Sequence, residues 1–170
     1  MGLDITAHKN LIKVVGDNLF DEDGELNDWD NHFQLHINPH YPDRASDISD
    51  GCVYSSGESL GFRAGSYGGY NGWREELARL AGYEFVKGES DRHGFSRGAW
   101  NSGEGPFWEI INFSDCGGVI GSEVSKKLLK DFCDFEEKAE GHESDNFKRL
   151  YKEWRGAFEL ASNNGCVDFH

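Results

Sequence analysis

Residues 61–83 read GFRAGSYGGYNGWREELARLAGY, the pattern of a strand, a glycine-rich turn and an amphipathic helix in direct succession. The turn is Gly65–Gly69, and the helix is predicted over about residues 71–81, with Gly82 as its stop. Four large apolar side chains recur at helical spacing and predict the buried stripe of this helix: Tyr70, Trp73, Leu77 and Leu80.

Alternation of apolar and polar residues predicts short strands on both sides of this stretch. The expected early strands cover residues 3–7, 11–15, 32–38, 52–56 and 60–67. The last two of these are expected to form a hairpin through Gly57-Glu58. The apolar run 107–113 predicts a central strand, and residues 166–170 predict a short closing strand.

Two longer helices are predicted near the C-terminus, over about residues 122–139 and 145–163, with Ser144 as the N-cap of the second. Polar, aperiodic sequence predicts long loops at 17–31 and 84–105. Strands therefore dominate the first half and helices the second. This order favours a single α+β domain over residues 1–170, mainly an antiparallel sheet with about three helices packed on one face.

The charge balance restricts the class of partner. The chain has 17 Lys and Arg residues against 31 Asp and Glu residues, a net charge of −14. Phosphate recognition by nucleic-acid-binding proteins and attraction to anionic lipid both need the opposite balance. We therefore expect no direct nucleic-acid binding and no membrane association. A basic surface on another protein, or a small ligand in a locally positive pocket, fits better.

The four cysteines show no CxxC spacing, and the N-terminus shows no signal-peptide pattern. Reduced thiols and a cytoplasmic location are the simplest expectation.

The glycine turn at residues 65–69 is the first candidate site. Backbone N–H groups entering a helix hold anions, Arg63 and Arg74 flank the turn, and its aromatic residues offer stacking surfaces for a flat ring. A nucleotide-like ligand is the corresponding hypothesis, although no GxGxxG or P-loop motif is present. A tight turn with core aromatics is the structural alternative. The candidate ligand-binding residues are Arg63, Ser66, Tyr67, Tyr70, Asn71, Trp73, Arg74, Ser114 and Asp115.

The second candidate site is the turn at residues 112–118, which also precedes a predicted helix. Asp115 and Cys116 could belong to a nucleophilic centre if His93 or His170 lay close to them. The alternative is that Asp115 caps the turn and Cys116 is a small buried residue. No catalytic residue is assigned, and a binding protein is favoured over an enzyme.

Metal and cofactor sites are not predicted. The spacing of His32, His36 and His40 suits one helix face, but the local pattern indicates a strand, in which residues four apart lie about 13 Å from each other. The acidic segment 17–30 does not match the register of a calcium-binding loop around Gly24. Acidic residues on the late helices are interpreted as solvated surface.

Four segments resemble a family of small, acidic, uncharacterised proteins of phages and prophages. They are MGLDITA (1–7), residues 61–83, GPFWEIINFSDCGGVIGSEVSKKLLKDF (105–132) and YKEWRGAFELASNNGCVDFH (151–170). The resemblance implies a bacterial host cytosol and action on a host component, such as a defence protein. The leading hypothesis is therefore an acidic binding protein. The alternatives are a binder of a nucleotide-like ligand and an enzyme using Asp115 and Cys116. Convergence of the two glycine turns on one cleft would favour the ligand.

Overall fold

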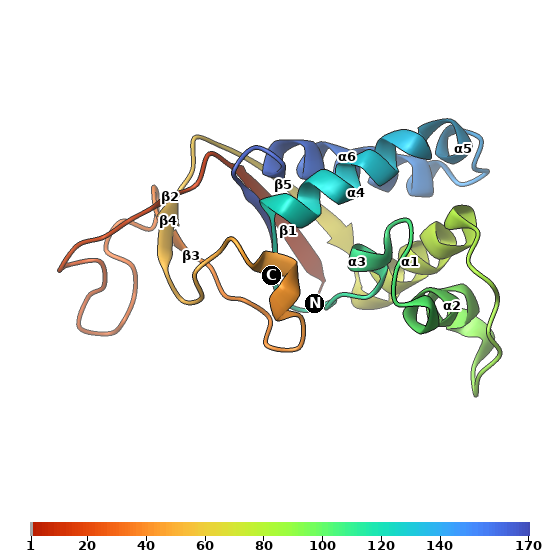
Figure 1. Cartoon of the computed structure of the whole chain (residues 1–170). Helices are drawn as coiled ribbons and strands as arrows, with labels where there is room; N and C mark the ends of the chain where they lie inside the picture. Colours follow the sequence, from red (N-terminus) through yellow and green to blue (C-terminus); the bar gives the residue numbers. More distant parts are fainter. Residues whose placement is uncertain (1) are drawn as a thin grey trace.

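The computed structural model describes residues 2–170 and shows an α+β fold with two antiparallel sheets (Figure 1). The larger sheet has the order β5-β1-β7-β6, built from β1 (Leu3–Lys9), β5 (Glu58–Gly65), β6 (Gly118–Gly121) and β7 (Cys166–Phe169). The smaller sheet has the order β2-β4-β3, built from β2 (Ile12–Lys13), β3 (Phe33–Gln34) and β4 (Val53–Ser55). The α+β class is thus confirmed.

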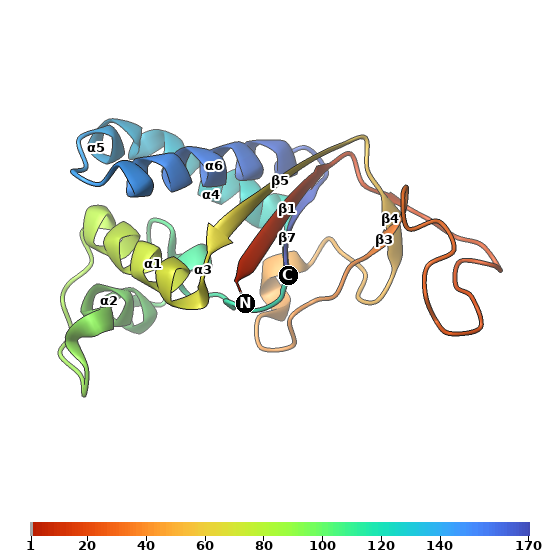
Figure 2. The same cartoon turned by 180° about the vertical axis from the view of Figure 1, so that it is seen from behind.

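Residues 2–170 contain six α-helices, in place of the three expected. They are α1 (Tyr67–Ala81), α2 (Gly94–Ser102), α3 (Trp108–Ile111), α4 (Ser122–Asp134), α5 (Glu136–Glu140) and α6 (Asp145–Ala161). Two 3₁₀ turns, η1 (Pro42–Ala45) and η2 (Asp91–His93), complete the set. Figures 1 and 2 show α4 and α6 running across the larger sheet, with α1, α2 and α3 grouped beside its end.

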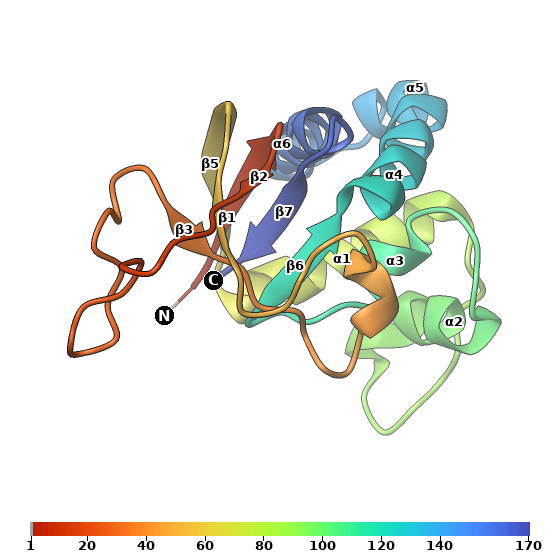
Figure 3. The same ribbon diagram turned by 60° about the vertical axis from the view of Figure 1, so that its left-hand side comes forward.

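The main core lies between the larger sheet and the helices. Leu3, Ile5 and Ala7 alternate along β1 and are all buried against this side. The fully buried indole of Trp154 on α6 lies among them. The opposite face of the sheet, which includes Val119, packs against η1 and the residues around it; η1 is the orange turn beside β6 in Figure 3.

The C-terminal strand lies inside the sheet, between β1 and β6. Thr6 pairs with Asp168, and Ile120 pairs with Val167. The expected hairpin of residues 52–56 and 60–67 is wrong, because β4 pairs with β2 and β3 whereas β5 pairs with β1 along its length. The chain passes from the smaller sheet to the larger one at Gly57. The strand β5 forms more backbone pairs with β1 (Leu3–Lys9) than it could with the shorter β4 (Val53–Ser55).

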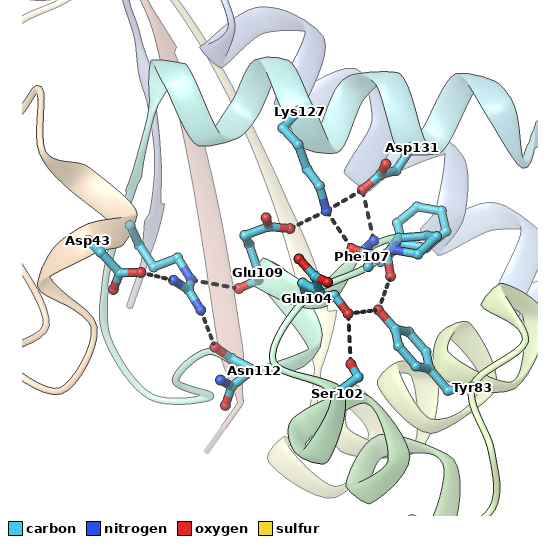
Figure 4. A network of polar contacts seen from close by, with 12 residues as sticks. Asp43, Tyr83, Ser102, Glu104, Phe107, Glu109, Asn112, Lys127 and Asp131 are labelled. Carbon is cyan, nitrogen blue, oxygen red and sulfur yellow. Dashed lines mark hydrogen bonds and ion pairs between the residues drawn. The ribbon is translucent and has the colours of Figure 1, made fainter.

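The prediction of a central strand at residues 107–113 is also wrong: this segment forms α3. A short apolar run fits a buried strand or a buried helical turn equally well, and here tertiary contacts decide. Asp131 on α4 accepts a hydrogen bond from the backbone N–H of Phe107 (2.8 Å), and Lys127 bonds Glu109 and Asp131 (Figure 4). The segment is therefore held under α4 as a turn.

The expected loop at 84–105 is wrong for the same kind of reason, since it contains α2. The buried carboxylate of Glu75 accepts hydrogen bonds from the N–H groups of Phe95 and Ser96, both at 2.8 Å, and so caps α2 from α1. Gly98 lets the backbone of Glu84 approach so closely that a Cβ would lie 2.0 Å from its carbonyl oxygen. Both contacts are distant in sequence.

Residues 14–32, which we call the acidic arm, extend away from the helices as the red-orange loop of Figure 1. Asp21 Oδ1 accepts hydrogen bonds from the N–H groups of Asp23 and Glu25, both at 2.9 Å, which fixes a turn near its tip. Within residues 2–170, no helix has the length and apolarity that crossing a membrane requires.

Candidate functional site

The first turns of α1 meet the second glycine turn. Ser66 caps the start of α1 by accepting a hydrogen bond from Gly69 N–H (3.1 Å), so Asn71 lies in the first turns of that helix. The side-chain amide of Asn71 donates to Asp115 Oδ2 at 2.8 Å. The loop after α3 and the start of α1 are therefore joined directly, and the cleft beside this bond is the candidate site.

The cleft consists of two hollows that share Arg74, Trp100 and Asp115 in their walls. The outer hollow has a volume of about 370 Å³ and is also lined by Asn38, His40, Tyr41, Asn112, Ser114 and Cys116. The inner hollow has a volume of about 260 Å³ and is completed by Asn71, His93 and Ser96. Their combined size is in the range of small-molecule sites.

Arg74 is buried and holds the loop before Asp115 in place through hydrogen bonds. Its Nη1 donates to the carbonyl oxygens of Phe113 (2.5 Å) and Ile111 (3.3 Å), and its Nη2 donates to Asn71 Oδ1. The guanidinium also lies 4.5 Å from the centre of the Tyr70 ring. Asn71 thus bonds both the buried guanidinium and the carboxylate of Asp115.

Two further side chains, which sequence reasoning missed, hold the same loop. Buried Arg44 donates through Nε to the carbonyl of Glu109 (3.3 Å) and through Nη2 to that of Asn112 (3.4 Å). Trp100 Nε1 donates to the carbonyl of Ile111 (3.2 Å). These contacts fix the backbone before Asp115. No local pattern could have revealed them, because each joins residues that are far apart or lie in mispredicted elements.

Some polar groups of the cleft have no partner among residues 2–170. The side chain of Ser96 is 2% exposed, and its Oγ makes no hydrogen bond within the described chain. Asp115 Oδ1 likewise has no hydrogen-bonded side chain there, unlike Oδ2. Trp100 is 42% exposed although its ring N–H is bonded. The cleft therefore exposes a carboxylate oxygen and an aromatic surface, whereas the hydroxyl of Ser96 is buried.

The predicted stacking role of Tyr70 and Trp73 is wrong. Their side chains are 0% and 4% exposed, and both rings stack on Trp154 in the core, with centroid distances of 5.6 and 5.7 Å. Burial raises the pKa of Tyr70 to about 12, while nearby Arg74 acts to lower it. The core interpretation of these aromatics, left open by the sequence, is the one that the structure bears out.

The other predicted ligand-binding residues divide into two groups. Arg63 is exposed and forms an ion pair with Asp4 (3.1 Å), Ser66 caps α1, and Tyr67 packs partly buried against the core; none of them lines either hollow. The predicted residues that do line the cleft are Asn71, Arg74, Ser114 and Asp115.

The proposed nucleophile lacks a base. Cys116 is exposed, and its Sγ lies 3.5 Å from Ser114 Oγ. Within residues 2–170 no hydrogen bond joins Cys116 to a histidine: His40 and His93 only line the hollows, and His170 bonds Thr6 (2.9 Å). In the same part of the chain, no group of three or more His, Cys, Asp or Glu side chains is placed to hold a metal ion.

A larger groove lies between α1 and the connection from α5 to α6, as two hollows of about 420 and 380 Å³. Its central polar groups bond one another. His142 Nε2 lies 3.2 Å from Glu76 Oε2, and His142 Nδ1 accepts a hydrogen bond from Ser144 N–H (3.1 Å). The cleft at Asp115, with free polar groups, is therefore the stronger candidate.

No protein-family model matches the chain, and no curated protein or solved structure is significantly similar to it.

Proposed function

We propose that this protein binds a small ligand in the cleft between α1, α2 and the loop at Asp115. The hydrogen bond from Asn71 to Asp115 carries the proposal, because it joins the first turns of α1 to the loop at Asp115 beside one cleft. The residues of the first glycine turn, 65–69, do not line this cleft, so the proposal rests on the start of α1 and on the second turn.

The composition of the cleft supports this role. Trp100 and Tyr41 give it an aromatic wall, and the rest of the lining is largely polar, with Asp115 held in position by Asn71. Such a lining suits a polar ligand with a flat face more than a purely apolar one. The loop backbone is held by two buried arginines, so the site needs little reordering when a ligand enters.

A ligand screen by two-dimensional NMR tests the proposal, with small aromatic and hydroxylated fragments as probes. We expect at least one fragment to shift the side-chain signals of Asn71 and Trp100, and Trp100→Ala to abolish the effect. Trp29 is the internal control, since it is 75% exposed and belongs to the acidic arm, which extends away from the helices (Figure 1). Shifts confined to Trp29, or no shifts at the cleft, would contradict the proposal.

A second candidate function is capture of a basic host protein by the acidic arm, in keeping with the resemblance to phage proteins and a bacterial cytosol. The arm contains no Lys or Arg and carries Asp17, Asp21, Glu22, Asp23, Glu25, Asp28 and Asp30. The observation that favours it is exposed apolar surface on the same arm: Val15 is 88% and Trp29 75% exposed. Acidic side chains alone would mainly raise the rate of association with a basic partner, whereas apolar side chains that become buried in the interface raise the affinity.

Pull-down from bacterial lysate at low and high salt tests this second function, with Trp29→Ala and a variant in which Asp21, Asp23 and Asp28 become Asn. We expect a partner that is retained at low salt, weakened at high salt and lost with either variant. A partner that binds both variants as well as the wild type would exclude the arm.

A further inference from the structure

We infer that the cleft takes an uncharged ring bearing adjacent hydroxyl groups, the shared chemistry of ribonucleosides and simple sugars, and that it discriminates against phosphorylated ligands. The inference rests on the proposed function and narrows the nucleotide-like ligand that the sequence suggested. Three features of the cleft support it. They are an arginine whose donors are already hydrogen-bonded, the carboxylate of Asp115 with one oxygen unbonded, and the hydroxyl of Ser96 without a partner within residues 2–170.

The first feature is the shortage of basic side chains with free donors. Among residues 2–170, Arg74 is the only Lys or Arg in the walls of either hollow, and His40 and His93 are the other basic side chains there. The Nη groups of Arg74 already donate to two backbone carbonyls and to Asn71. Three of the five N–H donors of the guanidinium are thus engaged. A phosphate that used these donors would have to break the bonds, and it would approach the carboxylate of Asp115 as well. Phosphate sites depend on the opposite arrangement, in which guanidinium donors point freely at the ligand.

The second feature is the carboxylate itself. Two carboxylate oxygens provide roughly four acceptor positions, and Asn71 occupies one of those on Oδ2. The amide also fixes the orientation of the group. Adjacent hydroxyls on a ring can donate to such a carboxylate together, and O–H donors to an ionised oxygen form the stronger class of hydrogen bond.

The third feature is an aromatic wall next to an unsatisfied hydroxyl. Trp100 is half-exposed, and its ring is fixed by the bond from Nε1 to Ile111, so stacking a sugar or a base on it costs little conformational freedom. Ser96 lines the inner hollow, and its Oγ has neither a partner within residues 2–170 nor accessible surface. A buried hydroxyl without a partner is unfavourable, so a ligand that displaced the atoms covering it would gain a hydrogen bond there.

Calorimetric titration separates the possible ligands. The probes are the four ribonucleosides, their 2′,3′-dideoxy counterparts, their 5′-monophosphates, and ribose and glucose as free sugars. We expect a ribonucleoside or a sugar to bind, with at least a roughly tenfold loss on removing the hydroxyls and at least a roughly tenfold loss on adding a phosphate. Binding by ribonucleosides alone identifies a nucleoside site, and equal binding by free sugars identifies a sugar site.

Monophosphates that bind as tightly as nucleosides would overturn the inference, as would dideoxynucleosides that bind as tightly as their parents. Failure of every hydroxylated ring to bind would also overturn it. The proposed function would survive that result if the wider fragment screen still shifted the cleft signals. It would fail only if those signals stayed unchanged throughout.

A pair of serine variants in α2 gives an independent readout. Ser96→Ala removes the unpartnered hydroxyl, so we expect it to raise the Tm of the unliganded protein by about 2–4 °C while weakening ligand binding several-fold. Ser102→Ala is the matched control, because Ser102 Oγ already donates to the carbonyls of Ala99 (2.8 Å) and Glu104 (2.7 Å) outside the cleft. It should lower Tm and leave binding unchanged. Unchanged binding in Ser96→Ala would contradict the assignment of that hydroxyl.

Discussion

Replacing Arg74 by methionine is the sharpest test of how the cleft is built. The side chain is 7% exposed and donates to the carbonyl oxygens of Phe113 and Ile111 and to Asn71. Hydrogen bonds from a charged donor contribute about 1.5–3 kcal/mol each, and each buried carbonyl left without a partner costs about 1–3 kcal/mol. Methionine recovers part of this by filling the space and removing a buried charge. We therefore expect a net loss of about 3–5 kcal/mol, the usual range for breaking a buried ionic network.

Urea unfolding measures this loss, provided that the m-value stays constant so that the change in midpoint reports stability. Arg63→Met is the matched control. Arg63 lies on the preceding strand, its side chain is 58% exposed, and its ion pair with Asp4 is solvated, so its removal should cost less than about 1 kcal/mol. If Arg74→Met lowered the free energy of unfolding no more than Arg63→Met does, the guanidinium of Arg74 would not stabilise the walls of the cleft. It would then be free to bind an anion, and the inference that the cleft discriminates against phosphate would be wrong.

Three further variants test the surrounding structure. Gly98→Ala should destabilise the protein by at least about 2 kcal/mol, because the new Cβ would meet the Glu84 carbonyl. Gly72→Ala has open space around the new Cβ and should stabilise the protein by about 0.5–1 kcal/mol. Thermal melts that rank the two variants the other way would refute this. Glu75→Ala should cost about 1–3 kcal/mol and raise amide exchange at the start of α2, where it caps two N–H groups. Burial raises the pKa of Asp168 from 3.8 to about 7. Between these two pH values the folded state therefore keeps a proton that the unfolded state has released. The contribution of this group to stability is consequently lost as the pH rises from about 4 to 7. Asp168→Asn should therefore stabilise by up to about 4 kcal/mol at pH 8 and progressively less toward pH 4, and a pH-independent difference in urea unfolding would contradict the raised pKa.

Local patterns predicted the elements whose stabilising contacts are close in sequence. The stripe of α1 and its end at Gly82 were expected, and Gly82 indeed adopts a left-handed conformation (φ 88°) that glycine tolerates. Ser144 was expected to cap α6, and its Oγ accepts a hydrogen bond from Phe147 N–H (3.2 Å). Capping and amphipathic spacing act over three or four residues, so a single sequence is enough to recognise them.

Elements held by distant partners were missed. The strand β6 was not predicted: its first residue, Gly118, was assigned to the turn at residues 112–118, and only pairing with β7 defines the strand. The predicted helix at 122–139 is divided at Phe135 into α4 and α5. For α2 and α3, the residues that decide the structure are Glu75 and Asp131, each about 20 positions away or more. Propensity is a weak guide where one distant carboxylate satisfies a helix terminus.

The candidate site shows the same division. The sequence by itself determined that two glycine-bearing turns precede predicted helices, with Asn71 and Arg74 on the first helix and Ser114 and Asp115 in the second turn. Only the tertiary structure decided that the start of α1 meets the second turn through Asn71 and Asp115, that Tyr70 and Trp73 belong to the core, and that Trp100 and Ser96 complete the cleft. The physical reason is that turn chemistry is local, whereas the direction in which an arginine donates depends on which backbone carbonyls the packed chain brings to it.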